Sequence, residues 1–95
     1  MTTEKVVLMT TEKEVLQEAR RLLSEIGWCQ GHFVTDREFC IIGAICKALQ
    51  ETNASTFALL GNPPTGFTSW VDWNDAPGRT KEQVLEQFDR RIAAL

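Results

Sequence analysis

The sequence lacks the long hydrophobic runs and basic blocks that mark membrane proteins and nucleic-acid-binding proteins. Its longest apolar segments, Val6–Met9 and Cys40–Cys46, are far shorter than the roughly 20 residues that a membrane-spanning helix needs. Ten Lys and Arg residues stand against thirteen Asp and Glu residues, which gives a net charge of −3. Since binding to a nucleic-acid backbone depends on cationic side chains, we expect neither a nucleic acid nor a membrane as partner.

Cysteine and histidine are also scarce, with three Cys and one His. The thiol count is odd, and the start of the chain has no apolar segment typical of a secretory signal. We therefore expect reduced thiols and a location in the cytoplasm. A chain of 95 residues, 43% of them hydrophobic, can form one domain around one small core. We expect no bound cofactor, because such a core leaves little room for a deep cavity.

Three capping patterns of the form Ser/Thr-x-x-Glu/Gln predict three helix starts, and each stands directly before apolar residues at helical spacing. The patterns are Thr11…Glu14, Thr35…Glu38 and Thr80…Gln83. They predict main helices over residues 11–26, 36–52 and 80–95.

The helix at 36–52 is apolar around most of its circumference, so we expect it at the centre of the bundle. Gly43 lies in its middle, at a cost of about 1 kcal/mol relative to alanine. This cost predicts that another backbone approaches the helix closely there. The first helix should end at Gly27 in the left-handed conformation, with Trp28 folding back on Leu23.

The remaining segments complete an all-α, single-domain bundle. One or two short helices are expected within residues 55–73, and Pro and Gly predict a type II turn at residues 76–79. The first sixteen residues repeat one octapeptide, MTTEKVVL and then MTTEKEVL. We expect residues 1–10 to be a loosely held extension and residues 11–95 to be a single helical domain.

Two turns rich in tryptophan and short polar side chains are the candidate binding sites. Their residues are Trp28 and Gln30 in the first turn, and Trp73, Asn74, Asp75 and Arg79 in the second. Such side chains suit the recognition of a polar, partly planar group or of a partner side chain. The alternative is structural, because tryptophans fill small cores and Asn-Asp before Pro-Gly builds turns.

A thiol–imidazole pair is the enzymatic alternative. His32 is the only possible imidazole base, Cys29 or Cys40 would be the thiol, and Asn74 or Asp75 would orient the ring. This hypothesis describes a small enzyme or ligand binder, and it requires these groups to converge in one pocket. No known cysteine-hydrolase signature surrounds either thiol, so we assign no catalytic residue.

A zinc site is the other chemistry that these residues suggest. Cys29-x-x-His32 has the spacing of two ligands. Cys40 and Cys46 are six residues apart, so they do not share one face of a helix. We therefore expect no metal site and predict that these two cysteines belong to the core.

Three segments resemble an uncharacterised family of small proteins from actinobacteria and their phages. They are GWCQG at 27–31, CIIGAICKAL at 40–49 and WNDAPGRTKEQVL at 73–85. The resemblance extends over residues 12–95, although the family usually has a longer insert than the short link at residues 31–38. It implies a mostly helical domain and an actinobacterial or phage origin, and it implies no activity.

The leading hypothesis is a non-enzymatic, phage-type accessory protein that binds and modulates a host protein. Amphipathic helices at 11–26 and 80–95 offer faces for such a partner. An exposed apolar patch would support this hypothesis, whereas an evenly charged surface with all three tryptophans buried would count against it.

Overall fold

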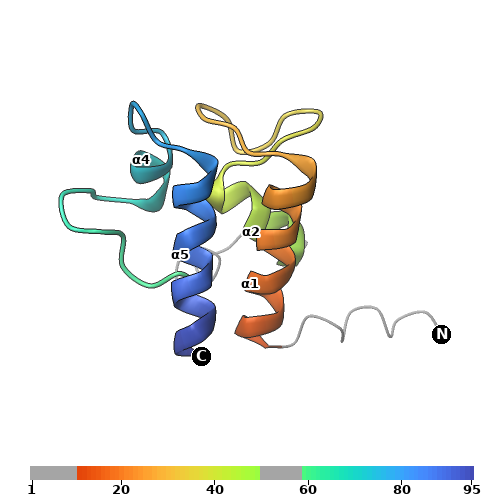
Figure 1. The fold of residues 1–95 in the computed structure, drawn as a ribbon. Helices are drawn as coiled ribbons and strands as arrows, with labels where there is room; N and C mark the ends of the chain where they lie inside the picture. The colour runs from red at the N-terminus through yellow and green to blue at the C-terminus, as the bar shows by residue number, and fades with distance from the viewer. Residues whose placement is uncertain (1–10, 50–58) are drawn as a thin grey trace.

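The computed structural model describes residues 11–49 and 59–95, and this part of the chain is mostly helical. Its elements are α1 (Glu12–Arg21), η2 (Leu22–Ile26), α2 (Ile41–Leu49), α4 (Trp70–Asn74) and α5 (Lys81–Ala94). The all-α prediction is confirmed. Helix α1 packs against α2 and α5, and α2 packs against α4; Figure 1 shows α1 and α5 side by side and antiparallel. The predicted extension at 1–10 and the first part of the predicted 55–73 segment lie outside the described residues.

The first and last main helices begin where their capping patterns predict. The Thr11 hydroxyl accepts a hydrogen bond from the main-chain N–H of Glu14, 3.1 Å away. Thr80 forms a complete capping box, in which its hydroxyl accepts from the N–H of Gln83 and the Gln83 side chain accepts from the N–H of Thr80. Both caps satisfy N–H groups that the first helical turn leaves unpaired.

Helix α2 starts at Ile41, five residues later than the predicted start at residue 36. The Thr35 hydroxyl does accept from the N–H groups of Arg37 and Glu38, at 3.3 and 3.1 Å. These bonds close an isolated turn and do not continue into a helix, because hydroxyl groups stabilise turns as readily as helix starts.

The backbone of Phe39 prevents an earlier start. Its N–H donates to the carbonyl of Gly27 at 3.0 Å, and its carbonyl accepts from the N–H of Cys29 at 2.9 Å. This is a parallel bridge between Trp28 and Phe39, and a second, antiparallel bridge joins Phe39 to Val34. Paired residues of this kind need extended dihedral angles, so Phe39 cannot belong to the helix.

The end of the first helix also differs from its prediction. Residues Leu22–Ile26 form a π-helix, and the N–H of Gly27 donates to the carbonyl of Leu22 at 3.2 Å. The wider turn rotates Ile26 away from the buried face of the first helix, and its side chain is 49% exposed. Gly27 has a positive φ of 151° but a ψ of 159°. This combination lies in a positive-φ region open essentially to glycine alone, and it differs from the predicted left-handed helical conformation. The Gly27 carbonyl accepts from the N–H of Phe39.

The core surrounds α2, as predicted from the apolar pattern. Ile41, Ile42 and Ile45 are at most 1% exposed, and Val84 and Phe88 of α5 are fully buried. The close approach of another backbone predicted at Gly43 is confirmed, and that backbone belongs to Phe33. A Cβ atom built on this glycine would overlap the carbonyl oxygen of Phe33.

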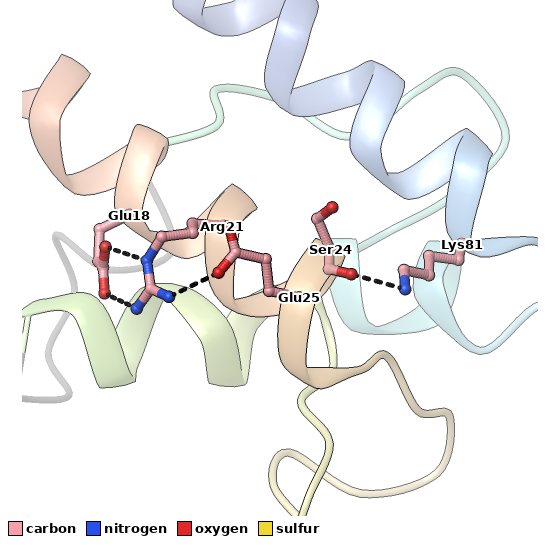
Figure 2. A network of polar contacts seen from close by, with 5 residues as sticks. All are labelled: Glu18, Arg21, Ser24, Glu25 and Lys81. Atoms are coloured by element: carbon pink, nitrogen blue, oxygen red, sulfur yellow. Dashed lines mark hydrogen bonds and ion pairs between the residues drawn. The ribbon is translucent and has the colours of Figure 1, made fainter.

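Surface contacts fix the end of the first helix relative to α5. The carbonyl of Ser24 accepts from the Lys81 ammonium group at 3.0 Å, as Figure 2 shows. Arg21 binds both Glu18 and Glu25, and its hydrogen bonds lower the pKa of Glu18. Because these ion pairs are exposed, they contribute little stability. The bond between Lys81 and Ser24 joins the end of η2 to the start of α5, the two places from which the candidate loops leave the bundle.

The segment before α5 contains the predicted short helix and the predicted turn. The Ser69 hydroxyl caps α4 by accepting from the N–H of Asp72 at 3.1 Å. In the turn, the N–H of Arg79 donates to the carbonyl of Ala76 at 3.1 Å, and Gly78 has the φ of 82° that a type II turn requires. No helix in the described ranges is long and apolar enough to cross a membrane.

Candidate functional site

The two candidate loops lie at the same end of the bundle. The first loop comprises residues 27–31 and follows η2, and the second loop comprises residues 73–79 and leads into α5. Figure 1 shows both at the end opposite the C-terminus. All six candidate residues therefore lie in two segments that meet in space although about 45 residues separate them along the chain.

Asn74 joins the two loops to the start of α2. Its side chain is fully buried. Its Oδ1 accepts from the indole N–H of Trp28 at 2.7 Å and from the main-chain N–H of Ile41 at 3.0 Å. Its Nδ2 donates to the carbonyl of Cys29 at 3.1 Å and to the carboxylate of Asp75 at 3.0 Å. Four bonds exhaust the capacity of an amide, so this side chain has none to offer a ligand.

Further hydrogen bonds close the contact between the loops. Nε2 of Gln30 donates to the carbonyls of Asn74 and Ala76, both at 3.0 Å. The main-chain N–H of Gly31 donates to Oδ1 of Asp75 at 3.0 Å. The first loop is thus held to the second by both side-chain and main-chain groups.

Arg79 covers the buried face of the second loop. Its guanidinium lies 3.9 Å from the centre of the Trp73 ring, and its Nε donates to the Trp73 carbonyl at 2.8 Å. Trp73 is 3% exposed and meets Trp70 edge to face, with ring centres 5.5 Å apart. A cation stacked on an aromatic face stabilises both groups, so these contacts give Arg79 and Trp73 a role in holding the loop together. A binding role for the six candidates stays a prediction.

A cavity of about 280 Å³ opens beside the contact between the loops. Its lining residues are Gly31, His32, Phe33, Cys40, Val71 and Asp75. The sequence pattern indicates His32, Cys40 and Asp75 as possible site residues, and it does not indicate Phe33 or Val71. The available signal was the pair Phe33-Val34, two large apolar side chains in the otherwise mostly polar stretch 30–38.

The thiols near this cavity are not activated. Sγ of Cys29 donates to the main-chain carbonyl of His32 at 3.5 Å, and not to its imidazole. Burial raises the pKa of Cys29, and the charges of Glu38 and Asp75 raise it further. Burial raises the pKa of Cys40 to about 11. Because the thiolate is the nucleophile, both groups are held in their unreactive form near neutral pH.

Within residues 11–49 and 59–95, no group of three or more His, Cys, Asp or Glu side chains is arranged to hold a metal ion.

Nearly the whole chain matches a known family, and the matching segment includes both candidate loops and α2. The family of unknown function DUF6197 matches residues 8–94. The chain belongs to this family. No curated protein and no solved structure matches it. The match includes both candidate loops and every residue that lines the cavity, so the site lies within the DUF6197 domain.

The protonated state of Cys40 in this DUF6197 member predicts slow alkylation. At about pH 7.5, a thiol with a pKa of about 11 is ionised to roughly one part in three thousand, against about one part in ten for an ordinary thiol. We expect iodoacetamide to modify Cys40 roughly 300-fold more slowly in the folded chain than in the urea-unfolded chain. Mass spectrometry of the alkylated peptides measures this rate. Equal rates in the two states would show that Cys40 is an accessible thiol whose pKa is not raised.

Proposed function

We propose that this protein is a non-enzymatic accessory protein of phage type that binds and modulates a host protein in the bacterial cytoplasm. The observation that carries the proposal is the exposed apolar pair Phe33–Val34 within residues 30–38, a stretch that we term the loop face. Every residue of this stretch is exposed, and the side chains of Phe33 and Val34 are 55% and 52% exposed. Two adjacent large apolar side chains beside a cavity are typical of a surface that a partner covers.

The loop face is held in one conformation. The carbonyl of Phe33 accepts from the N–H of Cys40 at 2.9 Å, and the N–H of Thr35 donates to the carbonyl of Glu38 at 2.8 Å. The bond from Gly31 to the second loop fixes its other end. A preorganised surface loses little conformational entropy when it binds, so this arrangement supports recognition of a partner with a matching apolar surface.

The tryptophans support a different location for the partner from the one that the sequence suggested. Trp70 and Trp73 are buried, and Trp28 is half-buried with its indole N–H bonded to Asn74. The surfaces of Trp70 and Trp73 are therefore occupied within the chain, and the polar group of Trp28 is already paired. We therefore place the partner on the loop face, next to the predicted loops and not on their aromatic side chains.

The alternative function, a small enzyme or ligand binder, has one observation in its favour. His32, Cys40 and Asp75 line the same cavity. The raised pKa of Cys40 opposes nucleophilic catalysis there. We therefore favour the use of this cavity for binding.

Photo-crosslinking tests the proposal directly. Benzoylphenylalanine is placed at position 34 and, as a control, at position 90, an exposed position on α5. We expect one host protein to be crosslinked in actinobacterial cells from position 34 and not from position 90. With that protein purified, the double variant Phe33→Ser/Val34→Ser should weaken its binding at least about tenfold, because hot-spot side chains contribute about 2 kcal/mol or more each.

The control variant is Leu95→Ser, which removes an equally exposed apolar side chain, 48% exposed, at the end of α5. It should leave the affinity unchanged. Equal crosslinking from both positions, or equal binding by the double variant and the wild type, would contradict the proposal. A crosslink to a second copy of the chain would identify the loop face as a surface for self-association.

A further inference from the structure

We infer that the cavity beside the loop face receives a basic side chain, lysine or arginine, from the partner protein, with the Asp75 carboxylate as its counter-ion. The inference rests on the proposed function and specifies the chemistry of the group that the partner inserts. Three features of the cavity carry it: its size, its apolar walls and its single anchored carboxylate.

The size and walls suit one long side chain. The volume of about 280 Å³ lies just below the range of roughly 300–1,000 Å³ in which small-molecule ligands usually bind. Phe33 and Val71 supply apolar surface, and Cys40 lies in the lining as a protonated thiol. The methylene stem of lysine or arginine packs on such walls while its charged end stays at the polar edge, and the Phe33 ring can also contact the cation.

The carboxylate is positioned but not neutralised. Oδ1 of Asp75 accepts from the N–H of Gly31 and from Nδ2 of Asn74. In the part of the chain that the structure describes, Oδ2 makes no hydrogen bond. Arg79, the cation of the same loop, is bound to the Trp73 carbonyl and ring instead. An incoming cation therefore meets an anchored carboxylate with one oxygen available for a charge-assisted hydrogen bond.

The same arrangement disfavours an anionic ligand. The main-chain N–H of Gly31, on the cavity wall, already donates to Asp75. The charges of Glu38 and Asp75 both act on Cys29 and raise its pKa, so the first loop lies in a negative potential. A phosphate or carboxylate would enter this potential without a free main-chain donor from Gly31.

Titration of isolated side-chain probes tests the inference without the partner. The probes are N-acetyl-arginine methylamide and N-acetyl-lysine methylamide, and the matched neutral probe is N-acetyl-norleucine methylamide, which has the stem without the charge. We expect the charged probes to shift the Gly31 amide and Val71 methyl NMR signals saturably, with dissociation constants on the order of millimolar. The neutral probe should bind at least about tenfold more weakly, since the carboxylate contributes only to the charged pair.

Asp75→Asn is the test variant, because its amide oxygen can keep both bonds that Oδ1 accepts while the charge is lost. It should reduce the affinity for the charged probes at least about tenfold, whereas Asp72→Asn, which alters an exposed carboxylate on α4, should not. Absence of saturable shifts, or equal affinity for charged and neutral probes, would overturn the inference even if no variant were made. Crosslinking from position 34 does not depend on Asp75, so the two proposals can fail separately.

Discussion

Replacement of Asn74 by leucine should lower the free energy of unfolding by about 4 kcal/mol. The substitution leaves the indole N–H of Trp28, the N–H of Ile41 and the carbonyl of Cys29 without their partners, and each buried unpaired group costs about 1–3 kcal/mol. A domain of this length is stable by roughly 5–14 kcal/mol. A loss of this size therefore removes a large share of its stability, and urea unfolding followed by tryptophan fluorescence measures it.

Asn74→Asp separates the loss of hydrogen bonds from the loss of shape. Aspartate can still accept from Trp28 and Ile41, but it places an oxygen against the carbonyl of Cys29 and the carboxylate of Asp75. We expect this variant to lose about 3 kcal/mol near neutral pH.

The loss of stability caused by Asn74→Asp should become smaller as the pH is lowered. Burial and the neighbouring carboxylate raise the pKa of an aspartate at position 74 in the folded state above its unfolded value. The folded variant then binds more protons than the unfolded one, so its stability relative to the wild type rises as pH falls towards about 5. The protonated side chain donates where the amide did.

Asn62→Asp is the matched control, because Asn62 is exposed. It should change the free energy of unfolding by no more than about 0.5 kcal/mol. Equal stability of the two aspartate variants, or a deficit at position 74 that does not depend on pH, would show that the Asn74 bonds do not hold the loops together.

Gly43→Ala should destabilise the domain by a net of about 1–3 kcal/mol. In an ordinary helix the same change stabilises by about 1 kcal/mol. Here the new methyl group overlaps the carbonyl of Phe33, which is also the acceptor for the N–H of Cys40. Overpacking costs about 1–3 kcal/mol and the disturbed hydrogen bond about 1 kcal/mol more. Urea unfolding measures the loss, and the amide shift of Cys40 reports the displaced loop.

The control for helix propensity is the reverse change at an exposed helical position. Ala93→Gly, in the last turn of α5, should lower the free energy of unfolding by less than about 1 kcal/mol. If both substitutions followed propensity, Gly43→Ala would be more stable than the wild type. That result would contradict the close contact between α2 and the loop face.

The parts of the fold that were predicted correctly depend on short-range interactions. Thr11 and Thr80 cap their helices through residues three positions away, so the pattern in the sequence contains the whole interaction. The turn at 76–79 is equally local, because Pro and Gly have restricted or special backbone angles. The close approach at Gly43 could also be predicted, because glycine destabilises a helix and a close packing contact offsets that cost.

The errors arise where distant segments pair. Phe39 lies outside the helix because its backbone bonds to Gly27 and Cys29. No sequence pattern around residue 39 predicts those partners. The candidate site shows the same limit. The sequence indicated that the two loops were chemically unusual, but the contact between Trp28 and Asn74 spans 46 positions. Such long-range contacts determine whether a tryptophan is buried within the domain or exposed to a partner.

The bond from Asn74 to Ile41 also has a consequence for folding kinetics. Asn74 supplies an acceptor for the first N–H of α2 from 33 residues further along the chain. That hydrogen bond can form only after a long loop has closed, which is slow compared with helix growth. Docking of α4 therefore stabilises the start of α2. A nascent chain that ends before α4 lacks this cap and cannot complete the contact on which the loop end of the bundle depends.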